Sequence, residues 1–81
     1  MNVALSYVLE PDTPLLKELD RVALLVDAST DEGKVIPAGS EGTIVGIWQR
    51  GLAYEVEFSR PSHALATVRI EHLRKLIHDE G

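Results

Sequence analysis

Two short segments on either side of a tight polar turn constrain this chain more than any other part of it. Residues 39–48 read GSEGTIVGIW and residues 53–58 read AYEVEF. β-branched residues, followed by strict alternation of apolar and polar side chains, predict two antiparallel strands joined as a hairpin. We expect Gly39 at a turn and Gly42 at a β-bulge, where a side chain would oppose the backbone. Together these features predict a small, strongly bent β-barrel.

The segment that begins at Thr13 allows two interpretations. Thr13 would cap a helix with Pro14 at its first position, and apolar residues three and four apart would line one face. Alternatively, residues 15–19 form one turn and residues 21–26 a buried strand. The strand is favoured, because a barrel needs a first strand before its long polar loop at residues 27–34.

The remaining elements follow in order along the chain. Strands are expected at residues 41–48, 53–58 and 64–69, a helical turn at 70–73 and a closing strand at 74–77. The fold class is therefore all-β. We expect an SH3-like barrel of about five strands, with one 3-10 or helical turn near the C-terminus.

Three parts are expected along the chain. Residues 1–12 form an N-terminal extension, residues 13–78 the barrel and residues 79–81 a tail. Eighty-one residues correspond to one domain.

A turn centred between Arg50 and Gly51 decides which side chains face the core. This register pairs three residues of the first strand with three of the second and assigns all six to the core: Thr43, Val45, Ile47, Tyr54, Val56 and Phe58. The opposite side then carries Ile44, Gly46, Trp48, Glu55 and Glu57, with Arg69 diagonal to Glu55. A slip of one residue would exchange the two sides.

Charge is distributed unevenly. The net charge is −5, and residues 1–41 contain eight acids and three bases, whereas residues 42–81 contain five of each. Phosphate backbones repel an acidic surface, so the charge argues against nucleic acid and favours a basic protein partner. The chain has no cysteine, no apolar run near the about 20 residues that span a bilayer, and no basic region of a signal peptide. We therefore expect a cytoplasmic protein without a membrane partner.

No residues form a recognisable reaction centre. The histidines at 63, 72 and 78 lack metal-binding spacing, so neither a metal nor a cofactor is expected. Glu55 and Glu57 share one strand face, where solvated carboxylates are far commoner than a catalytic pair. The sequence therefore predicts a protein that is not an enzyme.

Trp48 is the only tryptophan, and two roles compete for it. It would close one end of the barrel as a core or half-buried residue, or it would be an exposed anchor for a partner. The candidate partner-binding residues are Trp48, Tyr54, Glu55, Glu57, Asp27, Asp31 and Glu32.

Four segments resemble an uncharacterised family of small bacterial proteins, known mainly as a domain of unknown function. They read LDRVALL at 19–25, IPAGSEGTIV at 36–45, AYEVEF at 53–58 and LRKL at 73–76. The resemblance implies an SH3-like barrel and a strand at 21–26. It transfers no catalytic or binding residue.

The sequence therefore favours a protein-interaction module. Narrower forms are an antitoxin or immunity-type inhibitor and a phage-borne inhibitor of a host defence system. The alternative is a nucleic-acid-binding barrel that would gather its basic residues into one patch: Arg50, Arg60, Arg69, Arg74 and Lys75. An exposed barrel edge would also allow two copies of the chain to pair.

Overall fold

The first strand settles the two interpretations of the N-terminal half. A computed structural model gives the fold, and the structure describes residues 15–77. β1 (Arg21–Leu24) is extended and buries Val22 and Leu24, so the favoured strand is confirmed there. Turns occupy the segment just before it. The proposed start of a helix at Thr13, like the N-terminal extension, lies outside the described residues.

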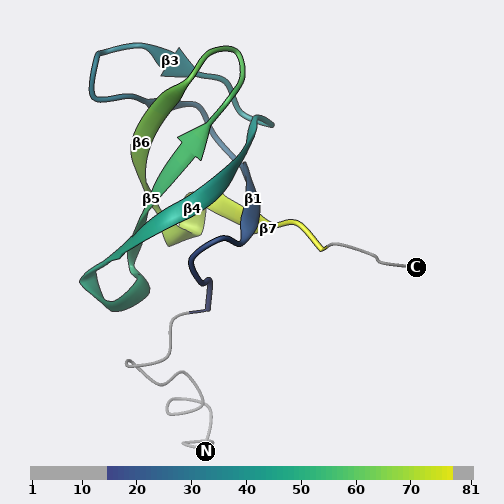
Figure 1. Cartoon of the computed structure of the whole chain (residues 1–81), viewed down its shortest axis with the longest axis vertical. Coiled ribbons are helices and arrows are strands. Elements are labelled where there is room, and N and C mark those ends of the chain that lie inside the picture. The colour runs from purple at the N-terminus through teal and green to yellow at the C-terminus, as the bar shows by residue number, and fades with distance from the viewer. Residues whose placement is uncertain (1–14, 78–81) are drawn as a thin grey trace, which may run out of the picture.

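Five strands form one antiparallel sheet in the order β6-β5-β4-β1-β7 (Figure 1). Beyond β1 they are β4 (Glu41–Trp48), β5 (Ala53–Phe58), β6 (Ala64–Arg69) and β7 (Leu73–Lys75). A separate pair, β2 (Ala28–Ser29) and β3 (Val35–Ile36), lies within the long loop between β1 and β4. The 3-10 turns η1 (Gln49–Gly51) and η2 (Ile70–His72) complete the described part. The all-β class is confirmed, and the sheet is not closed.

The core is built around the inward face of β5. Tyr54, Val56 and Phe58 are fully buried. They pack in one cluster with apolar side chains from the other strands of the sheet and from the long loop, including Val22, Ile36, Ile44, Ala66 and Val68. Burying one such side chain contributes about 1.5–3 kcal/mol. The apolar residues at alternate positions of β5 therefore contribute to the stability of the fold through their burial.

A β-bulge makes the predicted hairpin register correct at one end and wrong at the other. Ile47 pairs with Tyr54 as expected, but the register shifts between Ile44 and Gly46. Consecutive residues of β5 oppose these two, so Val45 is the extra residue and its side chain is 40% exposed. An extra residue of this kind reverses the order of faces along a strand, and counting back from the turn does not reveal it.

Beyond the bulge, the two faces of β4 are exchanged relative to the prediction. Ile44 opposes Val56 and is fully buried, although the turn register placed it outside. Gly42 opposes Phe58 on the inner side. Thr43, expected in the core, lies half-buried on the outer face.

Gly42 is required by a close approach of strands and does not lie at the bulge where it was expected. A Cβ atom added there would lie 2.7 Å from Val56 Cγ1 and 2.8 Å from the carbonyl oxygen of Glu57. Gly39 does lie at a turn, as predicted, with φ of +91°. Glycine is therefore favoured at the two positions for different reasons: lack of space at Gly42 and a positive φ at Gly39.

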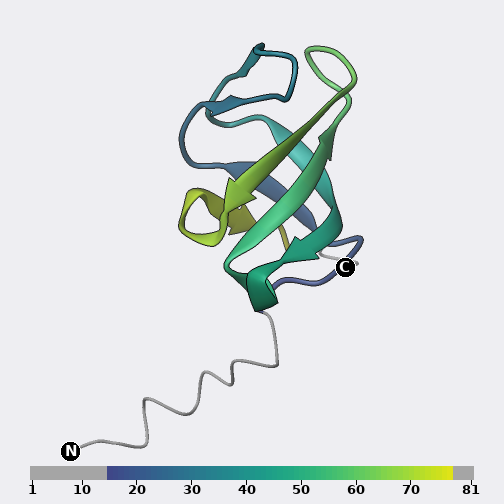
Figure 2. The same ribbon diagram turned by 90° about the vertical axis from the view of Figure 1, so that its left-hand side faces the viewer.

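Two loops that are distant in sequence lie at the same end of the molecule. Figure 2 shows the long loop between β1 and β4 beside the loop between β5 and β6, with the β4–β5 turn at the opposite end. Contacts between β2 and β6 connect the long loop to the sheet. Within residues 15–77, no helix has the length and apolar character needed to cross a membrane.

The contact at Gly42 predicts a large effect of one added methyl group. Gly42→Ala should lower the free energy of unfolding by about 3 kcal/mol, because overpacking here meets a backbone carbonyl that has little room to move. Gly46→Ala is the matched control, since its Cβ would lie 3.2 Å from only one atom, Glu55 Cβ, and should cost about 1 kcal/mol or less. Urea unfolding measures both, and equal losses would contradict this explanation.

Candidate partner-binding surface

A pocket of about 300 Å³ lies between the long loop and the start of β6. We call it the acidic pocket, and its lining residues are Thr30, Asp31, Glu32, Glu57, His63, Ala64 and Leu65. Three of the acidic residues predicted to contact a partner are therefore brought together from two separate segments. Ala64 and Leu65 supply apolar wall.

Thr30 organises the tip of the long loop. It is the one buried polar residue of the described part, and its Oγ1 accepts hydrogen bonds from the backbone N–H groups of Glu32 at 3.2 Å and Lys34 at 3.0 Å. The Thr30 N–H donates to the Lys34 carbonyl at 2.8 Å, and Gly33 closes the turn with φ of +83°. With its backbone groups satisfied in this way, the loop presents Asp31 and Glu32 as exposed side chains.

Glu57 reaches the pocket from the sheet. It lies on the outer face of β5, between Thr43 of β4 and Leu65 of β6. Among the residues that the structure describes, neither Glu57 nor Asp31 has a basic partner, and Glu32 is 4.0 Å from Lys34 Nζ. The pocket thus holds excess negative charge.

The arrangement suits a cation carried on an apolar stem. The methylene groups of a lysine or arginine would lie along Leu65, while the charged end would donate hydrogen bonds to the surrounding carboxylates. Across residues 15–77, no three histidine or acidic side chains are grouped so that they could hold a metal ion.

Trp48 lies at the other end of the hairpin, beside η1. It is 53% exposed, so it does not occupy a core position, and its role as a partner anchor stays a prediction. The indole Nε1–H donates to Glu55 Oε1 at 3.3 Å, and the hydroxyl of Thr67 donates to the same oxygen at 2.9 Å. These two bonds hold an apolar ring on the outer face, and we call this group the Trp48 corner.

Two predicted contact residues have structural roles. Tyr54 is fully buried and its hydroxyl accepts a hydrogen bond from the Leu16 N–H at 3.3 Å, so it is not available to a partner. The hairpin register had already placed Tyr54 toward the core, and burial of its ring is favoured over exposure. Asp27 Oδ1 accepts a bond from the Ala38 N–H at 2.8 Å, which ties the base of the long loop.

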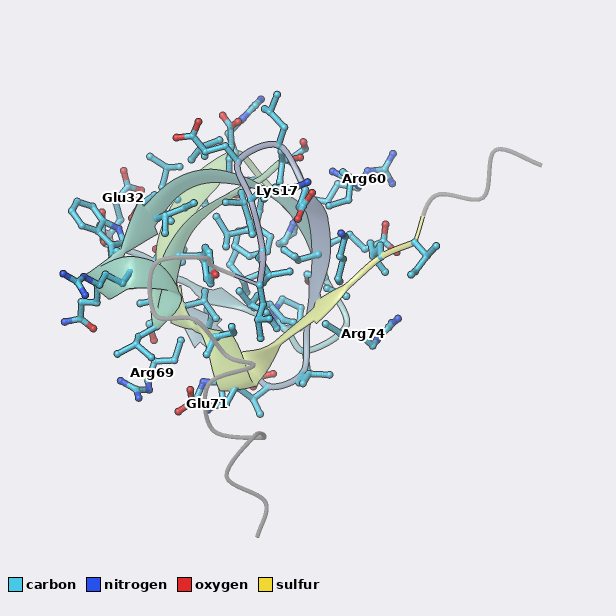
Figure 3. The ribbon with its side chains drawn as sticks, turned by 90° about the horizontal axis from the view of Figure 1, so that it is seen from below. Lys17, Glu32, Arg60, Arg69, Glu71 and Arg74 are labelled. Atoms are coloured by element: carbon cyan, nitrogen blue, oxygen red, sulfur yellow. The ribbon has the colours of Figure 1, made fainter. Side chains whose placement is uncertain are left out.

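Arg69 does not pair with Glu55 as the diagonal register suggested. Its Nε donates to Glu71 Oε2 at 2.7 Å, and this hydrogen bond is the main reason that the pKa of Glu71 is lowered. Figure 3 shows Arg60 and Arg74 on one side of the molecule and Arg69 with Glu71 away from them. The basic residues considered for nucleic acid therefore do not gather into one patch.

A family model matches most of the described chain. The model of DUF4926, a domain of unknown function, matches residues 18–75. The chain belongs to the DUF4926 family. The match runs from the residues before β1 to the end of β7, so the acidic pocket and the Trp48 corner both lie within the DUF4926 domain. Comparisons with curated proteins and with solved structures gave no match.

Thr30 and His63 line the pocket of this DUF4926 domain, but neither was among the predicted site residues. A threonine hydroxyl at the start of a polar turn commonly accepts a hydrogen bond from a backbone N–H two residues later. This local pattern could have identified Thr30. His63 was interpreted as a surface histidine, and it is exposed. It reaches the pocket that Glu57 also lines through the course of the β5–β6 loop, which no local pattern reveals.

Replacing the Thr30 hydroxyl tests how the loop is held. Thr30→Val keeps the shape but leaves two N–H groups without their acceptor, so the free energy of unfolding should fall by about 1 kcal/mol. Amide hydrogen exchange should accelerate at Glu32 and Lys34. Ser29→Ala is the control, because Ser29 is exposed and its side chain makes no hydrogen bond within the described residues. Unchanged exchange at both amides would show that the hydroxyl does not organise the loop.

Proposed function

We propose that this DUF4926 domain is a non-enzymatic, cytoplasmic protein-interaction module that binds a basic side chain of a partner in the acidic pocket. The observation that carries the proposal is the convergence of Asp31, Glu32 and Glu57 on one pocket with an apolar wall. The overall negative charge of the chain supports the same kind of partner.

Binding at the acidic pocket would combine modest contributions. An exposed ion pair is worth about 0–1 kcal/mol, and a hydrogen bond to a charged group about 1.5–3 kcal/mol. Carboxylates around a pocket also accelerate encounter with a basic surface, an effect that salt screens over about 8–10 Å. The complex should therefore form quickly and weaken as ionic strength rises.

The Trp48 corner would provide the second contact. Ala53 lies opposite Trp48, and Glu57 is four residues further along β5 on the same outer face, which is about 13 Å. Tryptophan is enriched among residues that dominate binding energy. A folded partner with a basic group and an apolar group at this separation would contact both.

The strand connections support assigning this fold to the SH3-like barrels of the bacterial family suggested by the sequence. The order β7-β1-β4-β5-β6, the long loop after the first strand and the 3-10 turn before the last one are consistent with that assignment. Within the interaction class, an antitoxin or immunity-type inhibitor would use the acidic pocket to cover a basic active site. A phage-borne inhibitor would use the same charge to imitate nucleic acid.

Neutralising the pocket should weaken partner binding. A double variant, Glu32→Gln with Glu57→Gln, should raise the Kd by about tenfold, because two charged contacts are lost. Glu18→Gln with Glu71→Gln removes the same charge elsewhere and should leave the Kd unchanged. The partner is first isolated by affinity co-purification from the native host, and its Kd for each variant is then measured by calorimetry.

Four outcomes would count against the proposal. An equal rise in Kd for the pocket variant and the control would show that the effect depends only on net charge. No weakening by the pocket variant would remove the acidic pocket from the interface, and an unchanged Kd for Trp48→Ala would remove the Trp48 corner. Co-purification of nucleic acid that is lost in high salt would favour the nucleic-acid alternative.

A further inference from the structure

A second hollow, of about 540 Å³, lies on the other side of the β5–β6 loop from the acidic pocket. Its lining has a different character and consists of Arg21, Gly39, Ser40, Glu41, Ser59, Arg60 and Pro61. Two guanidinium groups and two hydroxyl groups therefore border one space. We call it the arginine hollow, and Figure 3 shows Arg60 on the same side of the molecule as Arg74.

Arg21 is held in place from within the sheet. Its Nη1 donates to Thr43 Oγ1 at 3.0 Å, and its Nη2 lies 3.5 Å from Glu41 Oε1. These contacts use two of the five N–H donors of a guanidinium and fix its direction. The remaining donors are available to a ligand at no further cost in side-chain order.

Arg60 approaches the hollow from the β5–β6 loop. Within residues 15–77, no carboxylate forms an ion pair with it. Glu41 is the single acid of the lining, and it forms an ion pair with Arg21. The lining as a whole therefore carries a positive charge of one, in a chain whose net charge is −5.

We propose that the arginine hollow binds a phosphate group. A planar carboxylate is satisfied by one guanidinium, whereas a phosphate has three or four oxygens arranged tetrahedrally around it. Arg21 and Arg60 come from different segments and would contact separate oxygens. The hydroxyls of Ser40 and Ser59 would donate to the others. The volume leaves room for a small group attached to the phosphate.

This site is separate from the acidic pocket and does not rest on the proposed function. Arg21 on β1 lies opposite Thr43 on β4, and Thr43 lies opposite Glu57 on β5. The positions of Arg21 and Glu57 are therefore two strand spacings apart. Two spacings are about 10 Å, close to the screening length at physiological salt. The carboxylates of the acidic pocket therefore weaken the attraction for phosphate without cancelling it.

Titration with inorganic phosphate tests the site. Amide NMR signals of Ser40, Glu41, Ser59 and Arg60 should shift in a saturable way, with a Kd in the millimolar range, and sodium chloride at matched ionic strength should not reproduce the shifts. Arg60→Gln should weaken binding by about tenfold. Arg74→Gln, which removes the same charge on the same side of the molecule, should leave the Kd unchanged, and Glu57→Gln should not weaken it.

Several results would overturn the proposal. Shifts that stay linear with concentration, equal shifts in chloride, or equal weakening by the two arginine variants would each reduce the effect to general electrostatics. A second arm of the titration uses adenosine monophosphate beside inorganic phosphate. Tighter binding of the nucleotide would support a phosphorylated small molecule as the ligand, and equal binding would support the free anion. Loss of partner binding in the pocket variants with phosphate binding retained would separate the two sites.

Discussion

The pairing of β4 with β5, side by side in the sheet, is the contact on which the rest of the structure depends. Tyr54, Val56 and Phe58 are fully buried, and Gly42 allows the two backbones to approach where a methyl group would collide with Val56. With this contact formed, the outward residues of β5 are fixed on the opposite face, and the loops at each end follow. The proposed binding surface is thus a consequence of the core.

Sequence patterns predicted the elements well, and the details of faces less well. The alternating run at 53–58 identified β5 and its inward side correctly, because a period of two is a direct consequence of strand geometry. The face of Ile44 was wrong because one bulged residue reverses the alternation without changing local composition. The acidic residues of the long loop were predicted as candidate contacts from their composition. Their meeting with Glu57 arises from tertiary folding, which has no local sequence pattern.

The two hollows divide opposite charges across a single loop. Residues 59–61 border the arginine hollow and residues 63–65 border the acidic pocket, so the β5–β6 loop separates them. Neighbouring sites of opposite sign favour partners or ligands in a defined orientation, since a reversed approach brings like charges together. A small domain with a thin core can gain selectivity in this way without enlarging its apolar surface.

Because of the bulge at Val45, the number of residues in β4 decides which side chains lie on its outer face. Thr43 and Trp48 are five residues apart, so in a regular strand they would face opposite sides of the sheet. The extra residue places both on the outer face, where the Trp48 corner and Glu57 share one surface. Loss or gain of a single residue in β4 would exchange the faces of one half of the strand. Related chains that keep this surface should therefore differ in this strand by even numbers of residues, if they differ at all.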